Sequence, residues 1–114
     1  MHVLVIGDEP GIREVTRSAL GQEGYRVSRV LSRDALARLQ REGPDLAIVD
    51  AALQRMSAVE VATEARRHAI PVLLTTDEPV LEVQLAQFGF PCLRKPFAER
   101  ELLERRRRLN RRGT

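Results

Sequence analysis

The sequence predicts an α/β domain built on a five-stranded parallel sheet in the order 2-1-3-4-5, with helices on both faces. Strand-like apolar runs alternate five times with helical patterns, and the connections are short. This alternation is typical of right-handed βαβ crossovers. The most apolar runs, at 3–6, 46–50 and 72–74, suit central strands buried on both faces, whereas the mixed run at 25–30 suits an edge.

The first predicted strand and helix occupy the start of the chain. Val3–Ile6 is a continuous apolar run, as expected of a strand that is buried on both faces. Pro10 favours the first turn of a helix, and Gly24 closes that helix. Apolar residues recur between them at helical spacing, at Ile12, Val15, Ala19 and Leu20.

Residues 25–50 predict two strands on either side of a short helix. The run at 25–30 alternates polar and apolar side chains, as an edge strand with one solvated face would. Ser32 is a favourable N-cap for the helix, which Gly43 and Pro44 end. Leu46–Asp50 is then an apolar strand that stops on a carboxylate. The apolar stripe of the helix consists of Ala35, Leu36 and Leu39.

The second half of the chain predicts two further strands and three helices. Pro71 starts an apolar strand that ends in Thr75 and Thr76. Asp77 then resembles the cap of a short helix from Val80 to about Phe88, and a short strand follows that ends at Lys95. The apolar positions of the third and the last helix are Val59, Ala62 and Ala65, and Leu102, Leu103 and Leu109.

Length and composition exclude several classes of protein. A chain of 114 residues with 43% hydrophobic residues predicts one globular domain. The single cysteine, Cys92, excludes an internal disulfide and a cysteine-based zinc site, and suits a reducing cytoplasm. No apolar run approaches the length of a membrane helix, and the first residues lack the basic region of a signal peptide.

The net charge of +3 comes from the end of the chain, where residues 98–114 hold seven arginines and three glutamates. Basic clusters can bind nucleic acids through phosphate contacts. However, the four consecutive residues 105–108 cover all sides of a helix, and no aromatic residue lies among them for base stacking. We therefore expect a solvated helix end or the start of a linker.

Four polar side chains follow the apolar runs at the ends of predicted strands. Asp8, Asp50, Thr76 and Lys95 emerge at one edge of the sheet if the strands are parallel. Open α/β sheets bind ligands at this carboxyl edge, where the strand order reverses. The combination predicts an aspartate that accepts a phosphoryl group near a divalent metal ion.

These residues make the sequence similar to the receiver domain of bacterial response regulators, a flavodoxin-like fold whose chemotaxis member has the strand order 2-1-3-4-5. The resemblance covers nearly the whole chain and implies a receiver domain at 1–109, followed by a basic tail or the start of a linker at 110–114. It is carried by four segments in order, at 3–10, 44–50, 71–76 and 95–97.

The resemblance implies a role for each matched residue. Asp50 corresponds to the phosphoryl acceptor, and Thr76 and Lys95 to the hydroxyl and the ammonium group that contact the phosphoryl oxygens. Asp8, Asp50 and the backbone carbonyl of Ala52 correspond to the Mg²⁺ ligands. This assignment agrees with the preference of Mg²⁺ for a few carboxylates together with phosphate oxygens.

The sequence also departs from the family pattern. Gly7 replaces the first acid of a pair, which predicts a weakened Mg²⁺ site. Asp77 stands where the family prefers a small residue, and it would repel a phosphate unless it points away as a helix cap. Cys92 replaces the aromatic residue that commonly reports phosphorylation, and we expect it to be a packing residue. Further departures lie at Gln54, Ser57 and Ala58.

The implied partner is a sensor histidine kinase or a phosphotransfer protein in two-component signalling. Any enzymatic activity would be at most self-phosphorylation and dephosphorylation on an aspartate. The face of the last helix is a possible homodimer surface, and nucleic acid would be contacted only through an output domain beyond these 114 residues.

Two alternative functions remain at this point. The first is a pseudo-receiver, which would be a protein-interaction or dimerisation module without phosphorylation. The second is a small flavin or nucleotide binder on the same architecture. The segment from Gly7 to Gly11 lacks the backbone donors and hydroxyls that a phosphate-binding loop needs, which counts against the second.

Overall fold

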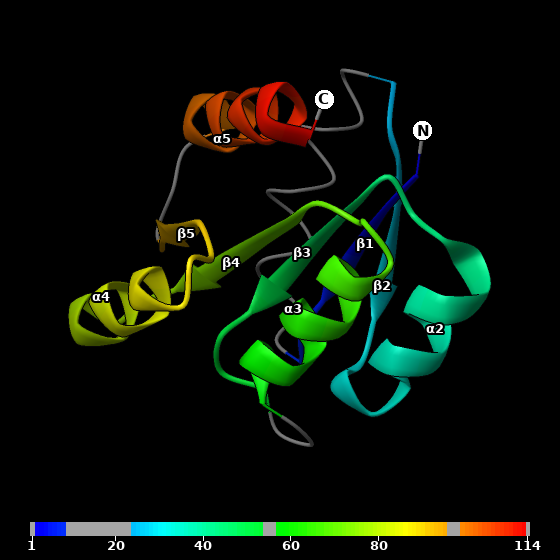
Figure 1. Cartoon of the computed structure of the whole chain (residues 1–114), viewed down its shortest axis with the longest axis horizontal. Helices are drawn as coiled ribbons and strands as arrows, with labels where there is room; N and C mark the ends of the chain where they lie inside the picture. Colours follow the sequence, from blue (N-terminus) through cyan, green and yellow to red (C-terminus); the bar gives the residue numbers. More distant parts are fainter. Residues whose placement is uncertain (1, 9–23, 54–56, 96–98, 114) are drawn as a thin grey trace.

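The computed structural model describes residues 2–8, 24–53, 57–95 and 99–113 (Figure 1). Its sheet has five strands, all paired in parallel, in the order β2-β1-β3-β4-β5, which confirms the predicted topology. The helix expected between Pro10 and Gly24 lies outside the described residues. The strands are β1 (His2–Ile6), β2 (Arg26–Val30), β3 (Leu46–Asp50), β4 (Val72–Thr76) and β5 (Cys92–Arg94).

Helices cover both faces of the sheet. Residues of α2, α3 and α4 pack with one apolar cluster, and Leu102 of α5 packs with the other. Figure 1 shows α2 and α3 side by side over one face and α5 crossing the top of the view. The helical elements are the 3₁₀ turn η1 (Ser32–Asp34), α2 (Ala35–Glu42), α3 (Ala58–Arg67), α4 (Pro79–Gln87) and α5 (Glu99–Gly113). No helix in the described part of the chain could span a membrane.

The central strands are apolar throughout because both of their faces are covered. Leu4 and Ile6 of β1 belong to the cluster under α2 and α3, whereas Val3 and Val5 belong to the cluster under α5. All four side chains are 0% exposed. Alternate residues of one strand therefore enter different cores, as the period of a strand requires.

The edge position of β2 is confirmed, but the expected alternation of solvated and buried residues is not. Arg26 is exposed, Val30 is buried, and the three residues between them are all partly buried. The polar ones turn back onto β1, because Ser28 contacts His2 and Arg29 contacts the chain just after Ile6. Cross-strand hydrogen bonds thus replace a solvated face.

Two predicted helix caps are wrong. Ser32 begins η1 rather than capping it, and its completely buried side chain contacts Asp8. Asp77 is exposed and lies one residue before Glu78, the N-cap of α4, which makes no side-chain capping bond. The local capping bond comes instead from Thr76, whose hydroxyl accepts a hydrogen bond from the Glu78 amide at 3.1 Å.

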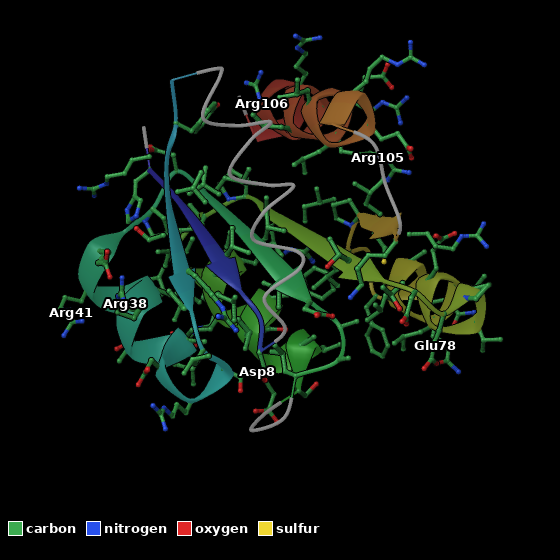
Figure 2. All side chains as sticks on the ribbon, turned by 180° about the vertical axis from the view of Figure 1, so that it is seen from behind. Asp8, Arg38, Arg41, Glu78, Arg105 and Arg106 are labelled. Carbon is green, nitrogen blue, oxygen red and sulfur yellow. The ribbon has the colours of Figure 1, made fainter. Side chains whose placement is uncertain are left out.

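Helix α5 is held to the sheet by arginines as well as by leucines. Leu102 is fully buried and Leu103 is partly buried, as predicted, while the side chain of Leu109 lies outside the description. Arg105 donates to the Cys92 carbonyl, and Arg106 lies over the Tyr25 ring and donates to its hydroxyl. Figure 2 shows both arginines on α5.

The expectation of a fully solvated arginine run is therefore corrected for these two residues. Arg107 and Arg108 are exposed, as expected. Helix α5 continues to Gly113, past the predicted boundary at residue 109. The division into a domain and a basic tail stays a prediction.

Candidate phosphoryl-acceptor site

The strand register places the predicted site residues at one edge of the sheet. Ile6 of β1 lies beside Val49 of β3, so Gly7 follows at the level of Asp50. Asp50 lies beside Thr75 of β4, and Thr76 lies beside Arg94 of β5. The carboxyl ends of β1, β3, β4 and β5 therefore lie along one edge of the sheet. This edge includes the switch point between β1 and β3, where this architecture binds ligands.

Asp50 is a buried carboxylate with charged and polar partners. It is only 1% exposed, and the Lys95 ammonium nitrogen lies 3.4 Å and 3.3 Å from its two carboxylate oxygens. The amide of Ala52 donates to Oδ1 at 3.0 Å. A carboxylate removed from water needs such partners, since burial alone strongly disfavours its charged form.

Backbone hydrogen bonds between β3, β4 and β5 hold these side chains in place. The Lys95 amide donates to the Thr76 carbonyl at 2.6 Å, and the Ala51 amide donates to the Thr75 carbonyl at 2.8 Å. The Thr76 hydroxyl accepts from Glu78, and a hydroxyl that accepts one bond can still donate its proton. We call Asp50, Thr76 and Lys95 the acceptor half of the site.

Thr75 is a second hydroxyl in the same region. It lies beside Asp50 in the register of β3 and β4 and is 0% exposed. Among the described residues its side-chain oxygen is buried without a hydrogen-bond partner, which carries a free-energy cost. The sequence run Leu74-Thr75-Thr76 contains this residue, but only the register shows that it adjoins Asp50.

The other half of the site is built from β1 and β2. The Asp8 carboxylate accepts from the Ser32 hydroxyl at 3.1 Å and 3.0 Å and from the Ser32 amide at 3.2 Å. Arg29 donates to the carbonyl of Asp8 at 2.9 Å and to that of Gly7 at 3.4 Å. Figure 2 shows Asp8 at the end of β1. We call Gly7, Asp8, Arg29 and Ser32 the β1–β2 half.

Sequence reasoning missed Arg29 and Ser32. An arginine in an edge strand is ordinarily solvated, and a serine before a helix is ordinarily a cap. The available signal was positional, because residues near the end of β2 must approach the end of its neighbour β1 in a parallel sheet. The contacts themselves depend on a register that the sequence does not specify.

The donor atoms of this edge suit Mg²⁺ but form a sparse site. Asp8, Asp50 and the Ala52 carbonyl offer the hard oxygen ligands that Mg²⁺ prefers, and the ion usually completes its coordination with waters and phosphate. Gly7 contributes no carboxylate at the level of Asp50. Within the described residues, no three His, Cys, Asp or Glu side chains gather to hold a metal ion.

The remaining departures from the family pattern lie mostly at the margin of the site. Asp77 is exposed, and Gln54 lies outside the described residues. Pro96 and Phe97, which match the family pattern, also lie outside the described residues. Ser57 caps α3, because its side chain accepts from the Val59 amide at 3.2 Å. Burial raises the pKa of the Cys92 thiol to about 11, so at neutral pH the thiol is a packing group without nucleophilic character.

A cleft continues from Lys95 along β5, between α4 and α5. It has a volume of about 510 Å³ and is lined by Glu82, Leu93, Arg94, Lys95, Glu101 and Arg105. Charges of both signs face it, and the Arg94 guanidinium lies 3.6 Å from the Glu82 carboxylate. The cleft therefore connects the acceptor half to the surface formed by the last two helices.

A comparison with protein families gives a single clear assignment. The model of the response regulator receiver domain matches residues 3–107. The chain belongs to this family. The receiver domain of two-component signalling systems is thus its established class, and the match includes every residue assigned above to the two halves of the site.

Curated relatives of this receiver domain are response regulators. It is 34% identical to the probable transcriptional regulatory protein TcrX of Mycobacterium tuberculosis, over 96% of this chain and 50% of that protein. It is 32% identical to the response regulator MprA of Mycolicibacterium vanbaalenii, over 100% of this chain and 52% of that protein. The chain spans about half the length of these relatives.

Solved receiver structures share the fold over nearly the whole chain. The chemotaxis response regulator CheY4 of Vibrio cholerae superimposes with a TM-score of 0.80 at 28% identity, covering 95% of this chain and 97% of that one. A response regulator from Chloroflexus aurantiacus gives a TM-score of 0.84 at 25% identity, covering 95% of both chains.

Proposed function

We propose that this receiver domain accepts a phosphoryl group on Asp50 from a phosphohistidine of a sensor kinase or a phosphotransfer protein. The observation that carries the proposal is the buried contact between Asp50 and Lys95, with Thr76 on the strand between them. A carboxylate can act as a nucleophile on phosphorus and form an acyl phosphate. The family membership supports the same reaction.

In the proposed reaction, a carboxylate oxygen of Asp50 attacks the phosphorus atom of the donor. The new O–P bond forms as the P–N bond breaks, and the imidazole leaves with the bonding electron pair and takes up a proton. Lys95 then follows the charge onto a phosphoryl oxygen, and the Thr76 hydroxyl donates to another. This role of Lys95 requires only that its 3.3 Å contact with Asp50 be exchanged for a phosphoryl contact.

We assign Asp8, Asp50 and the Ala52 carbonyl as the residues that hold Mg²⁺. When bound, the ion offsets negative charge on the transferring group. The chain's own contribution is to orient the carboxylates, through the Ser32 hydroxyl on Asp8 and the Ala52 amide on Asp50.

The signal is proposed to leave through the face formed by α4, β5 and α5. Lys95 and Thr76 are linked through the backbone, so a change in the contacts of either residue reaches both β4 and β5. Three large apolar side chains are exposed on α4 and at its C-cap, namely Val80 at 69%, Val83 at 59% and Phe88 at 61%. Exposed apolar groups on one short element suit a protein partner, including a second copy of this chain.

The relatives are about twice as long as this chain, so their whole activity exceeds what a receiver domain performs. The name of TcrX refers to transcriptional regulation. For the present chain we propose that any contact with nucleic acid is made by a further domain, because two of the arginines of α5 already hold that helix to the domain.

Intact-mass spectrometry tests the proposed function. The purified chain is incubated with Mg²⁺ and a small phosphodonor such as acetyl phosphate, beside the Asp50→Asn variant. The expected result is one added phosphoryl group on the natural sequence and none on the variant. No adduct on either protein at any Mg²⁺ concentration would refute the proposal and leave a protein-interaction role for the fold.

A further inference from the structure

We propose that Arg29 sets the divalent-cation affinity of this site, by holding a fixed positive charge against the backbone carbonyls of Gly7 and Asp8. The inference rests on the proposed function to the extent that Mg²⁺ binds at this edge of the sheet. Arg29 is a positioning residue in this proposal, because it affects the binding of the cation through Asp8.

Two hydrogen bonds fix the Arg29 guanidinium at the end of β1. Arg29 lies beside Val5 in the register of β1 and β2, and its side chain reaches forward past Ile6 to the carbonyls of Gly7 and Asp8. Nη2 donates to Asp8 at 2.9 Å and Nε donates to Gly7 at 3.4 Å. The planar guanidinium is thereby held by two of its donors, so its charge has a defined position.

Ser32 fixes the carboxylate of the same aspartate. Its side chain is 0% exposed, and its hydroxyl contacts both Asp8 oxygens while its amide contacts one. Both the backbone and the side chain of Asp8 are thus held by residues from β2 and the turn that follows it. A cation arriving at Asp8 meets a carboxylate that is already oriented and a positive charge that does not move away.

The charges of the two halves favour the same inference. Among the described side chains joined by the contacts above, Asp8 and Asp50 carry negative charge, and Lys95 and Arg29 carry positive charge. The bonds of Arg29 to neutral carbonyls leave its full charge in place. Because a divalent cation binds most tightly where carboxylates are in excess, this balance lowers affinity beyond the loss of the acid at position 7.

Mn²⁺ binding, followed by the electron paramagnetic resonance signal of the free ion, tests the inference without any phosphodonor. The natural chain is compared with Arg29→Gln, which removes the charge, and with Arg29→Lys, which keeps it. Arg26→Gln is the matched control, because Arg26 is exposed on the same strand and lies beside His2 at its other end. Gly7→Asp serves as a reference for an added ligand.

Arg29→Gln is expected to lower the Mn²⁺ dissociation constant by about fivefold, from the removal of one nearby positive charge. Arg29→Lys should stay near the natural value, and Arg26→Gln should not change it. An Arg29→Gln constant that is unchanged or raised would overturn the inference, as would an equal fall in Arg26→Gln or in Arg29→Lys. Binding too weak to detect in every variant would also overturn it.

The outcome is separable from that of the proposed function. A missing phosphoryl adduct with the expected order of Mn²⁺ constants would refute phosphorylation and retain the role of Arg29. An adduct on Asp50 together with a Mn²⁺ dissociation constant that does not change in Arg29→Gln would support phosphorylation and refute the role of Arg29. Circular dichroism of each variant verifies that the fold persists.

Discussion

The acceptor half and the β1–β2 half of the site share one edge of one sheet but differ in how their charges are used. In the acceptor half, the charge of Lys95 faces the charge of Asp50 at 3.3 Å. In the β1–β2 half, the carboxylate of Asp8 is bound by Ser32, and Arg29 is bound by backbone carbonyls. The ion pair of the acceptor half can exchange partners with an incoming group, whereas the contacts of the β1–β2 half orient Asp8 and Arg29.

We infer that the β1–β2 half can vary in sequence while the covalent chemistry proposed for Asp50 is kept. Bond formation needs the nucleophile and the groups that follow the phosphoryl charge, and all three are present here. In the proposed reaction the cation offsets charge, so we expect changes at its site to alter the affinity for the cation rather than the type of reaction. Four changes of sequence test these contacts, in order of decreasing effect on stability.

The largest effect is expected from Lys95→Met. The replacement leaves the 1%-exposed carboxylate of Asp50 without its cation and should cost about 3 kcal/mol of unfolding free energy. The double variant Asp50→Asn with Lys95→Met should recover most of that loss, because no charge is then left buried. Urea denaturation of the natural chain and of the two variants measures both values, and equal losses in the single and double variants would contradict a buried Asp50–Lys95 ion pair.

Ser32→Ala should have the next largest effect. Its buried hydroxyl contacts a charged carboxylate, and the loss of such a hydrogen bond costs about 2 kcal/mol. Ser57→Ala is the comparison variant, because it removes an exposed cap on α3 for about 1 kcal/mol. The same urea titrations provide the test. A smaller loss for Ser32→Ala than for Ser57→Ala would mean that the Asp8 contact is not a structural element.

Thr75→Val is expected to raise the stability of the domain, whereas the two previous variants lower it. It removes a hydroxyl that is buried beside Asp50 without a partner among the described residues, and it keeps the shape of the side chain. The variant should be more stable than the natural chain by about 1 kcal/mol. Thermal unfolding measures the change, and Thr63→Val on the exposed surface of α3 is the control. A destabilised Thr75→Val protein would show that the hydroxyl is bonded in solution.

The smallest effect concerns the opposite edge of the sheet, where His2 lies. Burial, with the nearby Arg26 and Arg38, lowers the pKa of His2 below its usual 6.5, and its ring contacts Ser28 at 2.9 Å. The unfolded chain therefore takes up a proton more readily than the folded one. The stability that neutral His2 contributes is complete above pH 6.5 and is lost as the pH falls. His2→Gln should flatten the acid side of the stability profile by a fraction of 1 kcal/mol. An unchanged slope between pH 7.5 and pH 5.5 would contradict this assignment.

The sheet and the acceptor half could be predicted because they depend on patterns that the chain repeats. Continuous apolar runs indicate strands buried on both faces, and Leu4 and Val5 do enter the two different cores. A parallel sheet then brings the ends of its strands to one edge, which is enough to place Asp50, Thr76 and Lys95 together. Their chemical roles stay predictions until a phosphoryl adduct is measured.

The β1–β2 half could not be predicted because its contacts join residues more than twenty positions apart through side-chain directions. Nothing local distinguishes Ser32 as a partner of Asp8 from Ser57 as a helix cap. The same holds for Arg106, which meets Tyr25 across 81 positions, while its neighbour Arg107 is exposed. In a run of four arginines, the rotation of the helix decides which side chain packs.

Reductive trapping with borohydride tests whether Asp50 is the acceptor, because it converts an acyl phosphate on aspartate into homoserine at the modified position. The natural chain is treated with Mg²⁺ and acetyl phosphate, reduced, digested and sequenced by mass spectrometry. If Asp50 is the acceptor, homoserine is expected at position 50. Homoserine at position 8, at another carboxylate or nowhere would contradict the assignment of Asp50 as the acceptor.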